Sequence, residues 1–366
     1  MARPNLVLVT TEGGPQNSAL CDIRGDTEPD QPCIQPGPGL HYRWALAPSP
    51  DPAPAVTSIL TSTYPSEHGV EATPAAFLSW LGPEPVAETL SEAGYSTAAF
   101  LSGTGLNRSR QLDRGFQIYA DEGPDDSVVE RALDWVQAAP GPWFLWIHLS
   151  HPDGPSGQGR LGEGPSSARP RSRSPTAHDL AQLIQGLNAQ SPPPGLIVTQ
   201  VGAHPEAANA PARTRPRWPG REGLRVQLFW QPPRSRTPRR IGRGIDQVVS
   251  QLDLAPTLLH AAGHPHPPGY RGTPLPQDPR SERAQPDRTL FAESPEAIAV
   301  IRGRDLAVFP IQGPATPSQG EREKAQHPIL LRLTDPPFEP AAPGRLEALS
   351  AALAADLEGS LPRPSR

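Results

Sequence analysis

The sequence predicts an α/β fold in which helices cover both faces of a mainly parallel central sheet. Three short, continuous apolar runs carry this prediction, at residues 5–10, 143–149 and 195–201. Strands that are buried on both faces of a parallel sheet have this uninterrupted apolar character. Segments with apolar residues at helical spacing lie between the runs, which is the element order of an α/β domain.

Three helices are expected, at residues 85–94, 125–139 and 176–189. The first has a proline near its start and a glycine at its end, which are typical helix boundaries. The other two place their apolar residues on one face. These residues are Val128, Val129, Ala132, Leu133 and Val136 in one helix, and Leu180, Leu183, Ile184 and Leu187 in the other.

The last part of the chain has a different pattern. Residues 289–293, 297–302 and 305–311 alternate with turn signals, which predicts a small antiparallel sheet. A helix is expected after it, at residues 344–359. We therefore expect a larger α/β domain at residues 1–285, with a small sheet-plus-helix subdomain at 286–366 packed on it.

Composition and charge limit the class of protein. The chain has 366 residues, of which 51 are proline and 33 are glycine, so long irregular loops are expected between the packed elements. The net charge of −5 argues against a nucleic-acid partner or an anionic membrane surface. The sequence contains no apolar run near the ~18 residues of a membrane span, and its start lacks the pattern of a signal peptide. We expect a cytoplasmic protein with neither a nucleic acid nor a membrane as partner.

Residues 45–70 are the most informative stretch of the chain for its function. A proline-rich approach leads into a short apolar run at residues 56–60, and a turn follows at 64–70, with the sequence YPSEHGV. A loop that feeds a helix N-terminus suits an anion, because the first backbone N–H groups have no partner inside the helix. A small anionic ligand is therefore one candidate partner.

Residues 60–70, LTSTYPSEHGV, resemble the LTGLYPxxHGV segment of the sulfatase family in the alkaline phosphatase superfamily. Residues 90–100, the run at 143–149 and LDLAPTLL at 252–259 are similar to further segments of that family. The resemblance covers residues 4–308. It implies a sulfatase-like α/β fold and, as the family activity, metal-dependent hydrolysis of sulfate esters.

The resemblance also places the family's nucleophile, which is a hydrated aldehyde made from Cys or Ser in a C/S-x-P-S/A-R box. The box aligns on residues 52–56, with Pro52 at the nucleophile position and Val56 at the Arg position. Proline has no nucleophilic atom, and valine cannot pair with an anion. Asp51 lies beside the replaced nucleophile, and its carboxylate is the alternative attacking group.

The implied metal positions are changed as well. Glu12 takes the place of a metal-binding Asp after the first strand, while Val201 and Gly202 replace an Asp and a His after the run at 195–201. His204 lies two positions later and would need a bulge to act as a ligand. A hard divalent cation such as calcium or magnesium needs several oxygen ligands, so these changes weaken the site.

Two further candidates follow the run at 143–149. His148 matches the first family histidine there, and Asp153 falls where the family has a second one that acts on the reacting oxygen. The resemblance therefore makes His148 and Asp153 candidate catalytic residues.

Two functional hypotheses remain open. The first is a sulfatase-family protein that has lost, or strongly reduced, ester hydrolysis and needs no cofactor. The second is an active, rewired sulfuric or phosphoric ester hydrolase that uses calcium or magnesium. Another branch of the superfamily, such as a phosphodiesterase, would need metal ligands at the same strand ends. The hypotheses differ in whether Glu12, Asp51, Asp153 and His204 converge in the folded chain.

Overall fold

A computed structural model describes residues 3–12, 39–71, 73, 75–103, 105–150, 175–202, 224–233, 244–275, 288–295, 297–311 and 329–332. Its main element is an eight-stranded sheet with the strand order β4-β3-β5-β1-β6-β7-β2-β8. The strands are β1 Leu6–Glu12, β2 Leu40–Leu46, β3 Ser96–Leu101, β4 Ile118–Ala120, β5 Trp143–Leu149, β6 Gly195–Val201, β7 Arg225–Gln231 and β8 Gly244–Ser250. Only β7 among these strands runs antiparallel to its neighbours, so the predicted mainly parallel sheet is confirmed.

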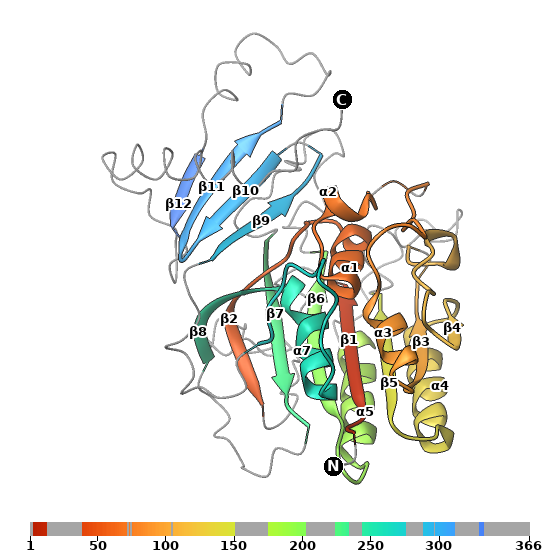
Figure 1. Ribbon diagram of the computed structural model, residues 1–366. Coiled ribbons are helices and arrows are strands. Elements are labelled where there is room, and N and C mark those ends of the chain that lie inside the picture. The colour runs from red at the N-terminus through yellow and green to blue at the C-terminus, as the bar shows by residue number, and fades with distance from the viewer. Residues whose placement is uncertain are drawn as a thin grey trace, which may run out of the picture.

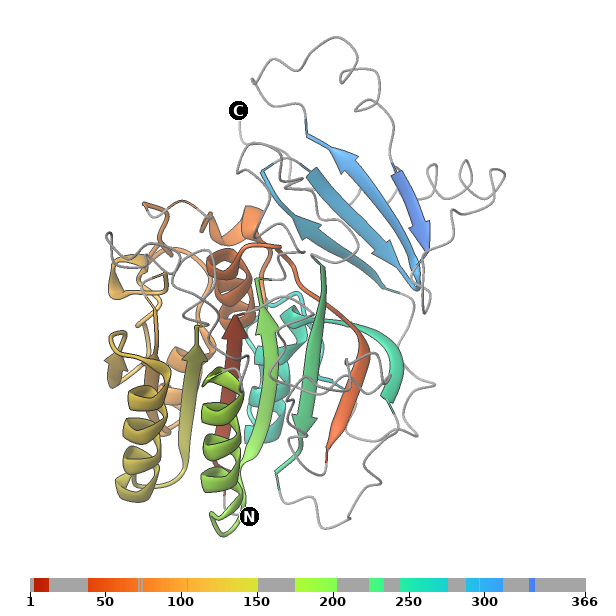
Figure 2. The same cartoon turned by 180° about the vertical axis from the view of Figure 1, so that it is seen from behind.

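Helices cover both faces of this sheet. They are α1 Pro52–Thr61, α2 Pro65–His68, α3 Val86–Glu92, α4 Asp125–Ala138, α5 Pro175–Asn188 and α7 Leu254–Ala262, with short 3-10 helices at Arg108–Arg110 and Gln251–Asp253. Figure 1 shows α1, α3 and α7 in front of the sheet, and Figure 2 shows α4 and α5 on the opposite face. The three predicted helices correspond to α3, α4 and α5, each within a few residues of its expected ends.

The central strand β1 shows why a parallel strand is apolar throughout. Leu6 and Leu8 belong to the core cluster under α1, α3 and α7, whereas Val7 and Val9 belong to the cluster under α4 and α5. All four side chains are fully buried. Alternate residues of a strand point to opposite faces, so burial on both faces requires an unbroken apolar run.

The small sheet has four antiparallel strands in the order β12-β11-β10-β9. They are β9 Thr289–Glu293, β10 Ala297–Arg302, β11 Asp305–Pro310 and β12 Ile329–Arg332. One face of the sheet shares a core cluster with Trp44 and Leu46 of β2, so the small sheet packs on the large one. The three predicted strands are confirmed, while the helix expected at residues 344–359 lies outside the described residues.

Two strands of the large sheet, β2 and β8, were not predicted from the sequence. They occupy the end of the sheet where the small sheet covers part of one face. Their burial therefore alternates with partial exposure, and polar residues such as His41, Arg43 and Asp246 interrupt the apolar pattern. A short run of this kind gives no clear strand signal. Among the described helices, none combines the length and apolar character needed to cross a membrane.

Candidate functional site

The segments that the sequence assigned to one site do meet, at the carboxyl ends of β1 and β6. Glu12 is the last residue of β1 and pairs in register with Val201 of β6. Gly202 follows directly, and a Cβ atom placed on it would lie 2.6 Å from Cγ of Pro52, the first residue of α1. Glu12, Val201, Gly202 and Pro52 therefore belong to one end of the sheet, as the alignment of the nucleophile and metal positions requires.

The N-terminus of α1 has few hydrogen-bond donors. Pro52 and Pro54 have no N–H group, and the Ala55 N–H donates to the Asp51 carbonyl at 3.1 Å. Among the first three helical residues, only Ala53 has an N–H group from which a ligand could accept a hydrogen bond. Anion binding at a helix N-terminus relies on several such groups. The expected anionic ligand therefore finds little support at this helix end.

The residues that the resemblance aligns with the family's arginine and nucleophile have packing contacts in the structure. Val56, at the position where the resemblance would put that arginine, is fully buried in the main core cluster. Gly202 has φ of +67°, a left-handed backbone that favours glycine, and its missing side chain lets the Pro52 ring approach. Asp51 is the N-cap residue, but its side chain makes no capping hydrogen bond. Pro52, which the resemblance aligns with the family's nucleophile, thus makes a packing contact with Gly202.

A chain of polar contacts runs from the core to Glu12. The indole Nε1–H of Trp146 donates to Thr10 Oγ1 at 3.1 Å, and Thr10 Oγ1 lies 2.9 Å from His148 Nδ1. His148 Nε2 lies 3.3 Å from Glu12 Oε1. With the proton on Nε2, His148 donates to the carboxylate, and Nδ1 accepts from the Thr10 hydroxyl; the other tautomer would put a lone pair against Glu12. The structure therefore joins two candidate residues, Glu12 and His148, to each other.

The described residues do not fit a divalent cation. Calcium and magnesium need several oxygen ligands, but Val201 and Gly202 offer no side-chain oxygen, and Glu12 already accepts from His148. Across the described part of the chain, no three His, Cys, Asp or Glu side chains are grouped so that they could hold a metal ion. Asp153 and His204, the other two candidates, lie outside the described residues.

Two members of this polar chain, Thr10 and Trp146, have no signal in the sequence. Both lie in apolar strand runs, where a threonine or a tryptophan fits as a β-branched or aromatic strand residue. Their hydrogen bonds depend on the pairing of β1 with β5, which puts Thr10 opposite His148. Only the strand register reveals this contact.

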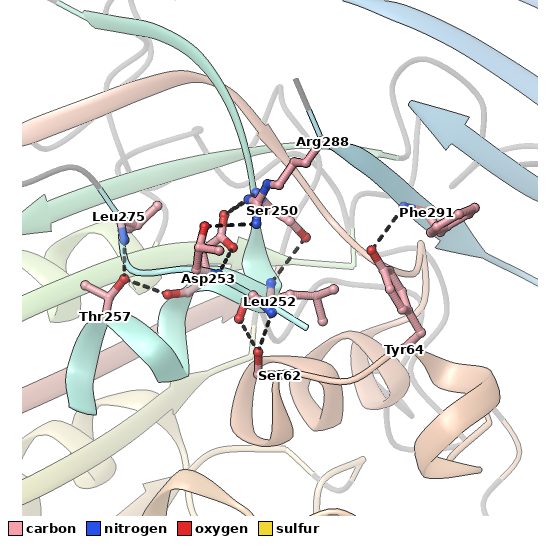
Figure 3. A network of polar contacts seen from close by, with 11 residues as sticks. Ser62, Tyr64, Ser250, Leu252, Asp253, Thr257, Leu275, Arg288 and Phe291 are labelled. Carbon is pink, nitrogen blue, oxygen red and sulfur yellow. Dashed lines mark hydrogen bonds and ion pairs between the residues drawn. The ribbon is translucent and has the colours of Figure 1, made fainter. Parts of the chain in front are cut away.

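The YPSEHGV segment lies at the other end of α1 and contacts the small sheet. The Ser66 N–H and hydroxyl both donate to the Glu293 carboxylate, at 2.7 and 2.9 Å. The Phe291 N–H donates to the Tyr64 hydroxyl at 3.3 Å, as Figure 3 shows. Glu67 forms an ion pair with Arg271. The segment that most resembles the family therefore joins two parts of the fold.

His68 of the same segment is a buried, neutral histidine. The Val70 N–H donates to its Nδ1 at 3.0 Å, so its Nε2 carries the proton and lies 3.0 Å from Ser58 Oγ. Burial lowers the pKa of His68 to about 3. This side chain therefore holds the turn after α2 in place and carries no charge at neutral pH.

Asp253 is the centre of the polar network in Figure 3. Its carboxylate accepts from the Ser250 N–H and the Thr273 N–H, both at 2.9 Å, and forms an ion pair with Arg288. The same network includes the Ser62 hydroxyl, which donates to the Leu252 carbonyl at 2.7 Å. Asp253 is also the N-cap residue of α7, but its side chain makes no capping hydrogen bond to that helix.

Comparison with known proteins supports the resemblance noted in the sequence. The family profile described as Sulfatase matches residues 4–264. No match is found among curated protein sequences.

Several solved structures have the same fold. A phosphonate monoester hydrolase of Agrobacterium radiobacter has a TM-score of 0.66 at 14% identity, over 98% of this chain and 95% of that one. A 2-O GAG sulfatase has a TM-score of 0.66 at 14% identity, over 98% and 91%. A protein in the alkaline phosphatase superfamily from Vibrio parahaemolyticus has a TM-score of 0.63 at 14% identity, over 98% and 87%. At this identity, these structures show a shared fold.

The family match extends through the large sheet to the end of α7, and therefore covers most of the chain. It includes every strand end at which the candidate site residues lie. The chain belongs to the sulfatase family.

Proposed function

We propose that this sulfatase-family protein has lost, or strongly reduced, the family's hydrolysis of sulfate esters. The observation that carries the proposal is the contact between Pro52 and Gly202 at the start of α1. Pro52, at the nucleophile position, packs against Gly202, at one of the metal positions. The proline ring has no nucleophilic atom, and glycine has no side chain. Hydrolysis by the family's route needs a nucleophile at this point.

The surroundings of Pro52 support the same conclusion. Pro54 removes a second backbone donor from the helix end, and the buried Val56 puts no cation at the position that the resemblance aligns with the family's arginine. Removal of a catalytic nucleophile alone lowers turnover by roughly 10⁶-fold in a well-studied hydrolase. Loss of nearby anion-binding groups lowers turnover further, because they stabilise the charge of the transition state.

The metal requirement of the family points the same way. Glu12 is the acid that β1 contributes to this strand end, and its carboxylate accepts from His148. A divalent cation there would have to displace this contact and find its other ligands elsewhere. We infer that the protein folds and functions without a bound cation.

An alternative is a rewired hydrolase for sulfuric or phosphoric esters. Asp51 supports it, because the carboxylate stands next to Pro52 and is not used to cap α1. A carboxylate can attack phosphorus or sulfur and form a covalent intermediate. This reaction would use Asp51 as the nucleophile, with Asp153 or His204 as its catalytic partner.

Turnover and metal content together test the proposal. Purified protein is assayed on an aryl sulfate, an aryl phosphate and an aryl phosphonate monoester, with calcium, magnesium or manganese, and its metal content is measured by elemental analysis. The variants Asp51→Asn and Glu12→Gln are compared with Asp246→Asn, an exposed acid on β8. We expect no stoichiometric metal in the purified protein. We also expect that any residual turnover is unchanged in Asp51→Asn and in Glu12→Gln.

Two results would overturn the proposal. Turnover that disappears in Asp51→Asn but persists in Asp246→Asn would establish the rewired hydrolase. Stoichiometric calcium or magnesium that is lost in Glu12→Gln would show that the strand ends still form a metal site.

A further inference from the structure

The loop between α2 and α3 is the most apolar exposed surface in the described part of the chain. Phe77, Trp80 and Leu81 are 51, 67 and 99% exposed. No charged residue occurs from position 72 to position 83. Figure 1 shows this segment beside α2, at the end of the molecule where the parallel strands have their carboxyl ends. We call residues 75–83 the apolar loop. Exposed apolar side chains that are grouped on one segment often mark a binding surface.

A buried arginine fixes one half of the apolar loop. The side chain of Arg110 donates to the carbonyls of Thr73 and Ala76, at 3.1 and 3.0 Å. Its own carbonyl accepts from the Leu78 N–H at 2.9 Å, and Leu78 is fully buried. Burial of a guanidinium group is costly unless its donors are satisfied, and here backbone carbonyls satisfy them. The backbone is therefore held in one shape.

A second arginine fixes the other half. Arg114 donates to the Ser79 carbonyl at 2.9 Å and forms a two-point ion pair with Glu88, at 3.1 and 2.7 Å. Its guanidinium group also lies against the ring of Trp80, 5.1 Å from the ring centre. A tryptophan that is two-thirds exposed thus has a rigid support on one side and a free face on the other.

We propose that the apolar loop inserts into the interfacial region of a zwitterionic lipid bilayer. Three observations favour a lipid over a protein partner. Carbonyls of the loop, at Ala76 and Ser79, already accept from arginines, so they lose little when they leave water. Tryptophan, leucine and phenylalanine are the residues that enter this region of a bilayer. The exposed side chains offer few hydrogen-bonding groups, whereas a protein interface has about one hydrogen bond per 100–200 Å².

Charge selects the lipid. The loop carries no charge of its own, and the net charge of the chain is −5, so an anionic membrane would repel the protein as a whole. A zwitterionic bilayer has no net charge and therefore does not repel the protein. The expectation of no membrane partner depends on net charge and on the lack of a spanning segment, and neither criterion detects a short exposed loop. The proposal is independent of whether the protein hydrolyses esters.

The test uses the full-length protein and large unilamellar vesicles of phosphatidylcholine. Binding is measured by co-sedimentation and by the blue shift of tryptophan emission. Leu81→Ser removes the most exposed apolar side chain and leaves the core intact, and Trp80→Ser is the second variant. Ile311→Ser is the matched control, since Ile311 is also exposed but lies beyond β11. We expect each loop variant to lower the partition coefficient about tenfold, and the control to leave it unchanged.

Several results would overturn the inference. One is absence of vesicle binding by the unaltered protein, and another is equal binding by Leu81→Ser. Binding to phosphatidylserine vesicles alone would show a charge-driven contact made elsewhere on the protein. Dimerisation in analytical ultracentrifugation that Leu81→Ser abolishes, without vesicle binding, would assign the loop to self-association.

Discussion

The two ends of α1 differ in how they are held. At the N-terminal end, Pro52 packs against Gly202, and the helix offers few donors. At the C-terminal end, Ser62 and the YPSEHGV segment enter a dense polar network that reaches Asp253, Arg288 and the small sheet. Figure 3 shows this network around the C-terminal end of the helix.

The difference separates what the fold needs from what the reaction needs. The residues that resemble the sulfatase family at the C-terminal end of α1 join the large sheet to the small one, and they are present. The residues at the N-terminal end, which the resemblance aligns with the family's nucleophile and anion site, are those that we propose no longer supply these groups. Similarity to the family at the C-terminal end of α1 therefore reports on the scaffold.

The largest effect on stability is expected in the polar network at the C-terminal end of α1, for the variant Asp253→Asn. Asp253 is almost fully buried and accepts from two backbone N–H groups and from Arg288. Replacing one partner of a buried ion pair costs about 3–5 kcal/mol, because the other charge stays buried without its partner. Urea denaturation measures the free energy of unfolding. The control is Asp246→Asn, whose ion pairs with Arg43 and Arg304 are long, at 3.7 and 3.9 Å, and should contribute less than about 0.5 kcal/mol. Similar losses of stability in both variants would contradict the assignment of Asp253 as a buried carboxylate that is paired with Arg288.

The pH dependence of stability tests the same end through His68. Burial lowers its pKa from 6.5 to about 3. A basic group with a lowered folded pKa stabilises the fold above the unfolded value and loses this contribution as the pH falls. Between pH 7 and pH 4 we expect a loss on the order of 3 kcal/mol from this group.

The measurement is urea denaturation across this pH range, with His68→Gln as the comparison. His41, whose pKa is lowered to about 4 by burial, contributes in the same direction and stays in both proteins. The difference between the two pH profiles therefore isolates His68. Parallel profiles would mean that His68 is not held neutral.

At the N-terminal end of α1, Gly202→Ala is expected to lower the free energy of unfolding by about 2–3 kcal/mol. The causes are left-handed backbone strain and overlap of the new methyl group with Pro52. Gly263→Ala is a matched control, because Gly263 has φ of +71° but no atom within 4 Å of its added Cβ. The control should cost about 1 kcal/mol. Adding Pro52→Ala should recover most of the difference. Equal costs for the two glycines would mean that Pro52 and Gly202 do not touch.

The sequence predicted most of the scaffold but little of the site geometry. Buried parallel strands such as β1 and β5 need unbroken apolar runs, so they are visible in the sequence. The contact of Pro52 with Gly202 and the chain from Trp146 to Glu12 depend on strand register and on where α1 begins. Those are three-dimensional facts that no local pattern encodes. The resemblance placed the right segments together, but it could not show that they pack against each other.

The smallest effect is expected at Glu293, where the polar end meets the small sheet. Burial raises the pKa of its carboxyl group above 4.5, although the Ser66 hydrogen bonds act in the opposite direction. An acid with a raised folded pKa stabilises the fold below the unfolded value, and this contribution is lost as the pH rises through the folded value. At pH 7, Glu293→Gln should therefore raise the free energy of unfolding slightly, since glutamine carries no charge and can still accept from Ser66. Glu122→Gln, at an exposed acid on the surface, is the control. A loss of stability in Glu293→Gln would show that the charged carboxylate is the form that joins the YPSEHGV segment to the small sheet.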